Sequence, residues 1–155
     1  MYYTVQIRLR TDEEQHQLLL AYEKIYVSAL HDLIEKMVKR KKCLCFSAYR
    51  YPSSIDKSSQ WMLYHMASKM AKSIQEKKKA VYHRSGTWTT SSFKIINDCL
   101  FLEYGNDFVC KTGRFLLAIN SKQQYQLNNG KKLRLDLIHD ENCWYCNILM
   151  QAKDT

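Results

Sequence analysis

The spacing of apolar residues changes near residue 86, and this change constrains the fold more than any other feature of the chain. Between residues 12 and 85, apolar side chains recur every three or four positions, as amphipathic helices require. From Thr87 onward apolar and polar residues alternate, as in half-buried strands, and Val5, Ile7 and Leu9 show the same alternation within residues 2–10. We therefore expect an α+β chain in which the first strand joins the later strands in one sheet or barrel, and the helices form an excursion from it.

The expected helices follow from their capping signals. Thr11 and Glu14 have the spacing of a capping box, which predicts a helix over residues 12–41. Residues 42–57, with Pro52, form a connector. A second helix is expected to begin near Ser58 or Ser59 and to end by about Ser85 and Gly86.

The expected strands after residue 86 are separated by turn signals. Asn97-Asp98 and Gly105-Asn106-Asp107 are predicted turns, and Asn128-Asn129-Gly130 predicts a hairpin turn between two strands. The predicted strands cover residues 93–95, 100–104, 108–110, 115–119, 132–138 and 143–150.

The positive charge is concentrated in one segment. Thirteen Lys and Arg residues lie between Lys36 and Arg84, against only Asp56 and Glu76, which gives this segment a net charge of +11. The rest of the chain has a net charge of −2. Such a field favours a polyanion as partner, the alternative being a lysine-rich surface that contacts only solvent.

Six aromatic residues interleave with the basic segment: Tyr49, Tyr51, Trp61, Tyr64, Tyr82 and Trp88. Rings beside Lys and Arg are typical of RNA and single-stranded contacts, where bases stack on the rings. Packing between the helices is the alternative for each ring. We expect one or two of them to be exposed for stacking.

No constellation for catalysis or metal binding is found. The pairs Cys43/Cys45 and Cys143/Cys146 raise the possibility of zinc, but residues three apart on a strand point to opposite faces, so buried thiols are expected instead. Asp136, Asp140 and Glu141 are interpreted as solvated turn residues. The sequence therefore predicts neither a cofactor nor a metal, and a protein that is not an enzyme by itself.

The element order and several short motifs resemble a known family. Ile7-Arg8-Leu9-Arg10 followed by Thr11-x-x-x-Gln15 and a Tyr-rich helix resembles the N-terminus of TnpB-type transposon-encoded RNA-guided nucleases. Ser92-Phe93-Lys94-Ile95 and the late Trp144-Tyr145 strand are similar to later parts of the same N-terminal module, which type V CRISPR effectors share. Arg10 stands where the family usually has Pro before Thr.

The resemblance implies a small wedge-type (OB-like) β-barrel with an inserted helical recognition lobe. The barrel would comprise residues 1–10 and 87–155, and the lobe residues 11–86. The RuvC-like nuclease of the family would lie beyond Thr155. The chain is therefore expected to be a fragment, a naturally split subunit or a nuclease-free relative.

The implied function is binding of guide RNA and of the guide–target duplex in an RNA-guided DNA-targeting complex. The candidate RNA-binding residues are Arg8, Arg10, Lys39, Arg40, Lys41, Lys42, Lys69, Lys72, Lys77, Lys78, Lys79, Arg84, Lys131, Lys132 and Arg134. The positions implied for contact with a target-adjacent DNA motif are Tyr51, Lys57, Gln60, Tyr64, Thr90 and Ser91.

The expected partners are guide RNA, target DNA and either a separate RuvC-like nuclease chain or a second copy. Neither a signal-peptide pattern at the N-terminus nor a membrane-spanning run is seen, so the expected location is the cytoplasm of a prokaryotic cell. The alternative function is a protein–protein interaction module, a dimerising subunit or a nuclease inhibitor, that docks a partner on the apolar stripe of the first helix.

Overall fold

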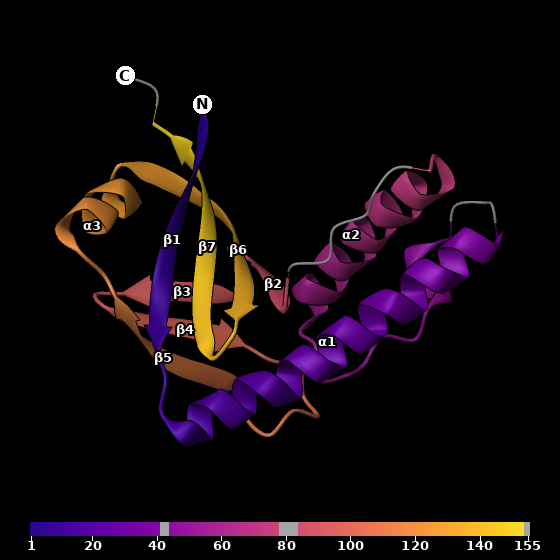
Figure 1. The fold of residues 1–155 in the computed structure, drawn as a ribbon, viewed down its shortest axis with the longest axis horizontal. Coiled ribbons are helices and arrows are strands. Elements are labelled where there is room, and N and C mark those ends of the chain that lie inside the picture. The colour runs from indigo at the N-terminus through magenta and orange to yellow at the C-terminus, as the bar shows by residue number, and fades with distance from the viewer. Residues whose placement is uncertain (41–43, 78–83, 154–155) are drawn as a thin grey trace.

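A computed structural model of the protein describes residues 1–40, 44–77 and 84–153, and it confirms the α+β class (Figure 1). The described residues form seven strands and three α-helices. The strands make one antiparallel sheet, and two of the helices extend from it. The elements are β1 (Tyr2–Arg10), α1 (Glu13–Arg40), a 3₁₀ helix (Phe46–Ala48), α2 (Lys57–Gln75), β2 (Gly86–Thr89), β3 (Phe93–Ile96), β4 (Cys99–Glu103), β5 (Thr112–Ala118), α3 (Ser121–Asn128), β6 (Gly130–Asp140) and β7 (Cys143–Ala152).

The strand order β2-β6-β7-β1-β5-β4-β3 confirms that the first strand joins the later strands in one sheet, and it places β1 in the middle of that sheet. β1 pairs with β7 on one side and with β5 on the other. Only residues 90–92 separate β2 from β3, although these strands stand at opposite ends of the order. The sheet must therefore curl, and it forms a half-barrel in which Trp88 Nε1 donates to Glu103 O across the gap at 2.8 Å.

The inward residues of the curled sheet form the core together with one side of α1. Ile7, Phe115, Leu135 and Trp144 are fully buried inside the sheet. Tyr22 of α1 stacks on Trp88 at a centroid distance of 5.1 Å, so the first half of α1 closes one end of the half-barrel. The apolar stripe predicted for this helix is thus buried within the chain.

The second half of α1, the connector and α2 form the helical lobe, which extends from the sheet (Figure 1). The connector returns to the sheet, where Gly105 N donates to Ser54 O at 2.8 Å, before α2 begins. α1 and α2 pack through buried side chains, among them Tyr26, whose hydroxyl lies 3.6 Å from Met66 Sδ. Both helices end at the outer tip of the lobe.

Three helix boundaries differ from the predictions. The capping box of α1 uses Asp12 and Gln15, each accepting from the backbone N–H of the other, rather than Thr11 and Glu14. Asp56 caps α2, which therefore begins at Lys57 and not at Ser58 or Ser59. α2 ends at Gln75, about ten residues earlier than expected, because Lys77 adopts a left-handed φ of 60°.

Two errors concern the strand region. Residues 108–110 are not a strand, because Phe108 N closes a turn on Gly105 O and the Phe108 ring packs edge-on against Tyr22. Asn128-Asn129-Gly130 is not a hairpin turn but the end of α3, which the prediction lacked entirely. α3 has weak apolar periodicity, and its start depends on a capping box between Asn120 and Gln123.

Candidate nucleic-acid interface

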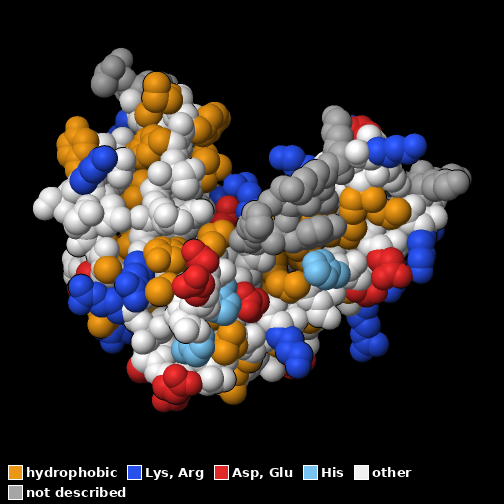
Figure 2. Space-filling model, viewed as in Figure 1, with side chains coloured by type: hydrophobic (Ala, Val, Ile, Leu, Met, Phe, Trp, Pro, Cys, Tyr) orange, Lys and Arg blue, Asp and Glu red, His pale blue; other side chains and the backbone are white. Residues whose placement is uncertain are grey.

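The cations predicted on the helical lobe gather near its outer tip. Lys39 and Arg40 form the last turn of α1, and Lys69, Lys72 and Lys77 lie at the corresponding end of α2, all of them exposed. Figure 2 shows Lys and Arg side chains on both halves of the molecule, including a group at this tip. The predicted residues Lys41, Lys42, Lys78 and Lys79 lie outside the described residues.

The acids of α1 engage some of these cations. Glu35 accepts from Lys39 at 2.9 Å, a contact that raises the lysine pKa. Asp32 accepts from Lys36 at 3.0 Å and from the Tyr49 hydroxyl, and these two bonds lower the pKa of the Asp32 carboxyl. By contrast, the chain has no acidic residue between Lys57 and Gln75, and the acids of α2 are confined to its two caps, Asp56 and Glu76.

A second cationic surface covers the outer face of β1, β5, β4 and β3. Arg8 and Arg10 are exposed there, as predicted. The register adds two cations that the sequence analysis missed, because Arg114 and Lys94 both pair with Phe101 from either side. Directly paired residues share a face, so these side chains lie beside one another. The pairing of β1 with β5 joins these two cations to Arg8 and Arg10, and the alternation within β3 and β5 alone does not reveal it.

The cations predicted on β6 behave differently from one another. Lys131 is exposed and Lys132 is half-buried at the start of the strand, where they pair with the end of β7. A register shift follows, between Lys132 and Arg134. Arg134 belongs to a different environment, which it shares with Arg84.

Arg84 and Arg134 both bind a buried carboxylate. Asp136, which is 6% exposed, lies 3.3 Å from Arg84 Nε and 3.2 Å from Arg134 Nε. Thr87 Oγ1 also donates to it at 3.1 Å. The interpretation of Asp136 as a solvated turn residue is therefore wrong: it lies in the middle of β6 and joins the end of the lobe to the sheet. Two guanidiniums expected to contact RNA phosphates are engaged with this carboxylate.

The residues implied for DNA contact fall into two groups. Gln60 donates to the Pro52 and Ile55 carbonyls, and the Tyr64 hydroxyl donates to Leu44 O at 2.6 Å, so both side chains hold the connector in place. Tyr51 stacks on Phe46 at 4.8 Å, and burial raises its pKa to about 12. Lys57 on α2 is exposed, as are Thr90 and Ser91 in the turn after β2, against which α2 packs.

The aromatic residues of the basic segment also differ in how far they are exposed. Trp88 is fully buried, whereas Trp61 on α2 is 48% exposed. Tyr49, Tyr51 and Tyr64 are half-buried, and Tyr82 lies outside the described residues. Trp61 is therefore the ring of this set that most clearly meets the expectation of an exposed stacker.

A cluster of ionisable groups lies between α1 and the β6–β7 hairpin. His139 stacks on Trp144 at 3.9 Å, Trp144 Nε1 donates to His16 Nδ1 at 2.8 Å, and His139 Nδ1 lies 3.1 Å from Glu23. Ser85 Oγ also donates to Glu23. The carboxylate lies between the hydroxyl and the imidazole, so the imidazole is not placed to take the serine proton as a nucleophile site requires. The sequence did not indicate this cluster, because its members are up to 128 positions apart.

The cysteine geometry agrees with the strand argument. Cys146 is buried and Cys143 half-buried on opposite faces of β7, and burial raises the pKa of the Cys146 thiol to about 12. Cys45 is exposed, and its neighbour Cys43 lies outside the described residues. Within residues 1–40, 44–77 and 84–153, no three His, Cys, Asp or Glu side chains are arranged to hold a metal.

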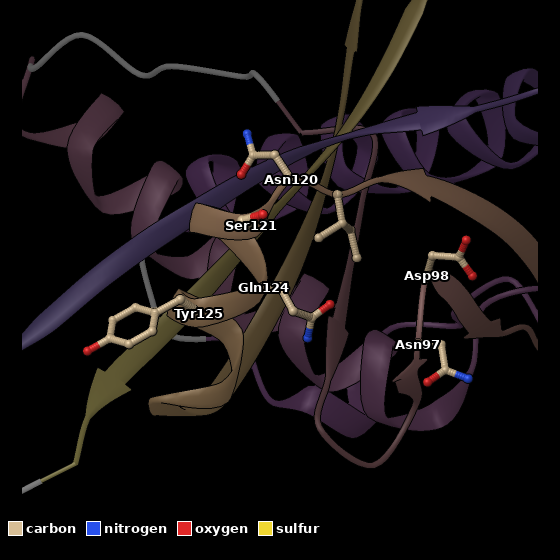
Figure 3. A pocket seen from close by; sticks show the side chains of 7 residues that line it. Asn97, Asp98, Asn120, Ser121, Gln124 and Tyr125 are labelled. Atoms are coloured by element: carbon tan, nitrogen blue, oxygen red, sulfur yellow. The ribbon is translucent and has the colours of Figure 1, made fainter.

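An open hollow lies between the β3–β4 turn and α3, lined by Asn97, Asp98, Ile119, Asn120, Ser121, Gln124 and Tyr125 (Figure 3). Its polar groups are amides and hydroxyls with a single carboxylate, and no cation lines it. The Asn120 side chain is engaged in the cap of α3. This hollow therefore does not extend either cationic surface.

In the part of the chain that the structure describes, no helix combines the length and apolar character needed to cross a bilayer. Neither a protein-family model nor a curated protein sequence matches the chain.

Proposed function

We propose that this chain is a nucleic-acid-binding module of an RNA-guided DNA-targeting complex, in which it binds guide RNA and the guide–target duplex. The observation that carries the proposal is α2, which exposes Lys57, Lys69 and Lys72 and has acidic residues only at its two caps. Phosphate oxygens are the partners that such a helix fits best.

The two cationic surfaces suggest a division of contacts. The outer face of β1, β5, β4 and β3, with Arg8, Arg10, Lys94 and Arg114, suits folded guide RNA. The tip of the helical lobe, with Arg40, Lys69 and Lys72, suits the backbone of the guide–target duplex. Lys57, Thr90 and Ser91 remain available for a target-adjacent DNA motif.

The curled sheet with helices inserted between β1 and β2 supports assignment as an OB-like wedge barrel of TnpB type. The chain then acts without catalysis of its own, in the cytoplasm of a prokaryotic cell. Nuclease activity, where the complex has any, belongs to a RuvC-like chain.

The test is a salt series of RNA and duplex binding by anisotropy. Each phosphate contact contributes about one unit to the slope of log affinity against log salt concentration. Lys69→Glu with Lys72→Glu should weaken duplex binding and reduce that slope. The matched control, Lys122→Glu with Lys153→Glu, makes the same change in net charge at exposed sites on α3 and after β7 and should leave the slope nearly unchanged. A slope near zero for the wild-type chain, or equal loss in both variants, would contradict the proposal.

One observation favours the alternative function, contact with another protein. Leu116 and Ile96 are 48% and 56% exposed, and both pair with Cys99 on the outer face of the sheet. An apolar row bordered by cations resembles the core and rim of a protein interface. Leu116→Asp should abolish self-association or capture of a nuclease chain if this function is the correct one, as sedimentation would show.

A further inference from the structure

Four exposed residues form an oblique row along α2. Lys57, Trp61, His65 and Lys69 follow at intervals of four positions, so each lies beside the next on the helix surface, while the row turns by about 40° around the helix at each step. At 1.5 Å per residue the row rises about 18 Å along the helix axis. A cation stands at each end and two aromatic rings stand between them; this set is called the α2 row.

The Trp61 ring is held in place by neighbouring rings, yet the residue remains 48% exposed. Phe46 meets it edge-on at 4.9 Å, His65 meets it edge-on at 4.5 Å, and the Tyr64 ring lies within 24° of parallel to it at 5.9 Å. Tyr64 is fixed in turn by its bond to Leu44 O. A ring that is ordered before a ligand arrives loses little conformational freedom on binding.

The neighbouring acids are engaged elsewhere. The Asp56 carboxylate caps α2 through Ser58, and on the adjacent helix Asp32 and Glu35 bind Lys36 and Lys39. The row itself carries the two cations Lys57 and Lys69 and no acid, so its own charge is positive. An apolar face with a cation at each end fits a base with its flanking phosphates.

We propose that the α2 row binds single-stranded nucleic acid, with an unpaired base stacked on Trp61 and flanking phosphates on Lys57 and Lys69. The inference rests on the proposed function and narrows it, because a paired base has both faces covered by its neighbours in the duplex and cannot stack on the indole. The unpaired strand would be a displaced DNA strand or an unpaired stretch of RNA.

Tryptophan fluorescence gives a direct readout. Trp88 and Trp144 are fully buried, so quenching by an added oligonucleotide reports on Trp61. The probes are oligo(dT) and oligo(U) of about eight nucleotides and a blunt DNA duplex of mixed sequence. Quenching should saturate with the single strands and not with the duplex.

The variants separate stacking from charge. Because these variants lack the Trp61 reporter, their affinities are measured by anisotropy of labelled oligonucleotides. Trp61→Leu should weaken single-strand binding by about 5- to 150-fold and leave duplex binding unchanged, and Trp61→Phe should restore most of the loss. Tyr125→Leu is the matched control, because Tyr125 is 68% exposed on α3, outside the α2 row. Circular dichroism melts must show that each variant folds.

Retained single-strand affinity in folded Trp61→Leu, or equal losses for single strand and duplex, would overturn the inference and leave the proposed function standing. Wild-type chain that binds none of the probes would overturn both.

Discussion

Replacing Asp136 with asparagine should destabilise the protein without creating a cavity. The Asp136 carboxylate is buried, forms ion pairs with Arg84 and Arg134, and accepts a hydrogen bond from Thr87. The substitution leaves the two guanidiniums without a counter-charge. Breaking a fully buried ion pair costs about 3–5 kcal/mol. The side chains of Arg84 and Arg134 keep 33% and 27% of their exposure, so water compensates part of the loss. We expect a loss of about 2–3 kcal/mol in the free energy of unfolding.

Thermal melts measure this loss. For a chain of this size, each kcal/mol shifts the melting temperature by about 2–4 °C, so Asp136→Asn should melt about 4–12 °C lower than wild type. Asp140→Asn is the control, because Asp140 is exposed on the same strand, and it should change stability by no more than about 0.5 kcal/mol. A double-mutant cycle with Arg134→Gln should give a coupling energy above about 0.5 kcal/mol.

The same variant tests what the two arginines do. If Asp136 holds Arg84 and Arg134 away from RNA, releasing them should tighten RNA binding slightly or leave it unchanged. A melting temperature within about 2 °C of wild type would refute the argument that this carboxylate joins the lobe to the sheet.

Two further predictions concern buried hydroxyl and thiol groups. Burial raises the pKa of Cys146 from 9.0 and that of Tyr26 from 10.0 to about 12. Both groups therefore ionise at a lower pH in the unfolded chain than in the folded chain. Stability should be fully present below about pH 9 and fall as the pH rises towards 12, by up to about 1.4 kcal/mol per pH unit for each group; melting temperatures that stay level over this range would contradict it. The Tyr22 hydroxyl is buried with no hydrogen-bond partner among the described residues, whereas that of Tyr26 lies 3.3 Å from Thr87 Oγ1. Tyr22→Phe should therefore be neutral or stabilising and Tyr26→Phe should cost about 1 kcal/mol, and denaturant melts that reverse this order would refute the assignment.

The sequence predicts the elements whose periodicity is strong. The long apolar stripe of α1 and the alternation in β1 and β7 survive in the structure, because burial of one face determines both pattern and fold. α3 escaped prediction, since among its eight residues only Leu127 is buried. The early end of α2 was not predicted either, because Lys77 adopts a left-handed conformation that nothing in the lysine-rich sequence indicates.

The candidate site was predictable only where a single element builds it. Arg8 and Arg10 alternate with buried residues on β1, so their exposure follows from the strand pattern. Lys94 and Arg114 join them only through the pairing of β1 with β5, in which Arg8 lies opposite Ala118, 110 positions away, and no local pattern specifies that pairing. Asp136 was misassigned for a related reason: its counter-charge Arg84 comes from a segment 52 positions earlier, so its burial is invisible in the local sequence.

These placements change how the charge of the basic segment should be understood. A net charge of +11 treats every cation as available to a ligand, yet Arg84 neutralises a buried carboxylate and Lys36 and Lys39 bind acids of α1. The field that a ligand meets therefore depends on the exposed cations of α2 and of the outer sheet face, two surfaces that belong to different parts of the sequence. Because the salt dependence of binding counts phosphates actually neutralised, its slope should follow the number of contacts on these two surfaces rather than the charge of the segment.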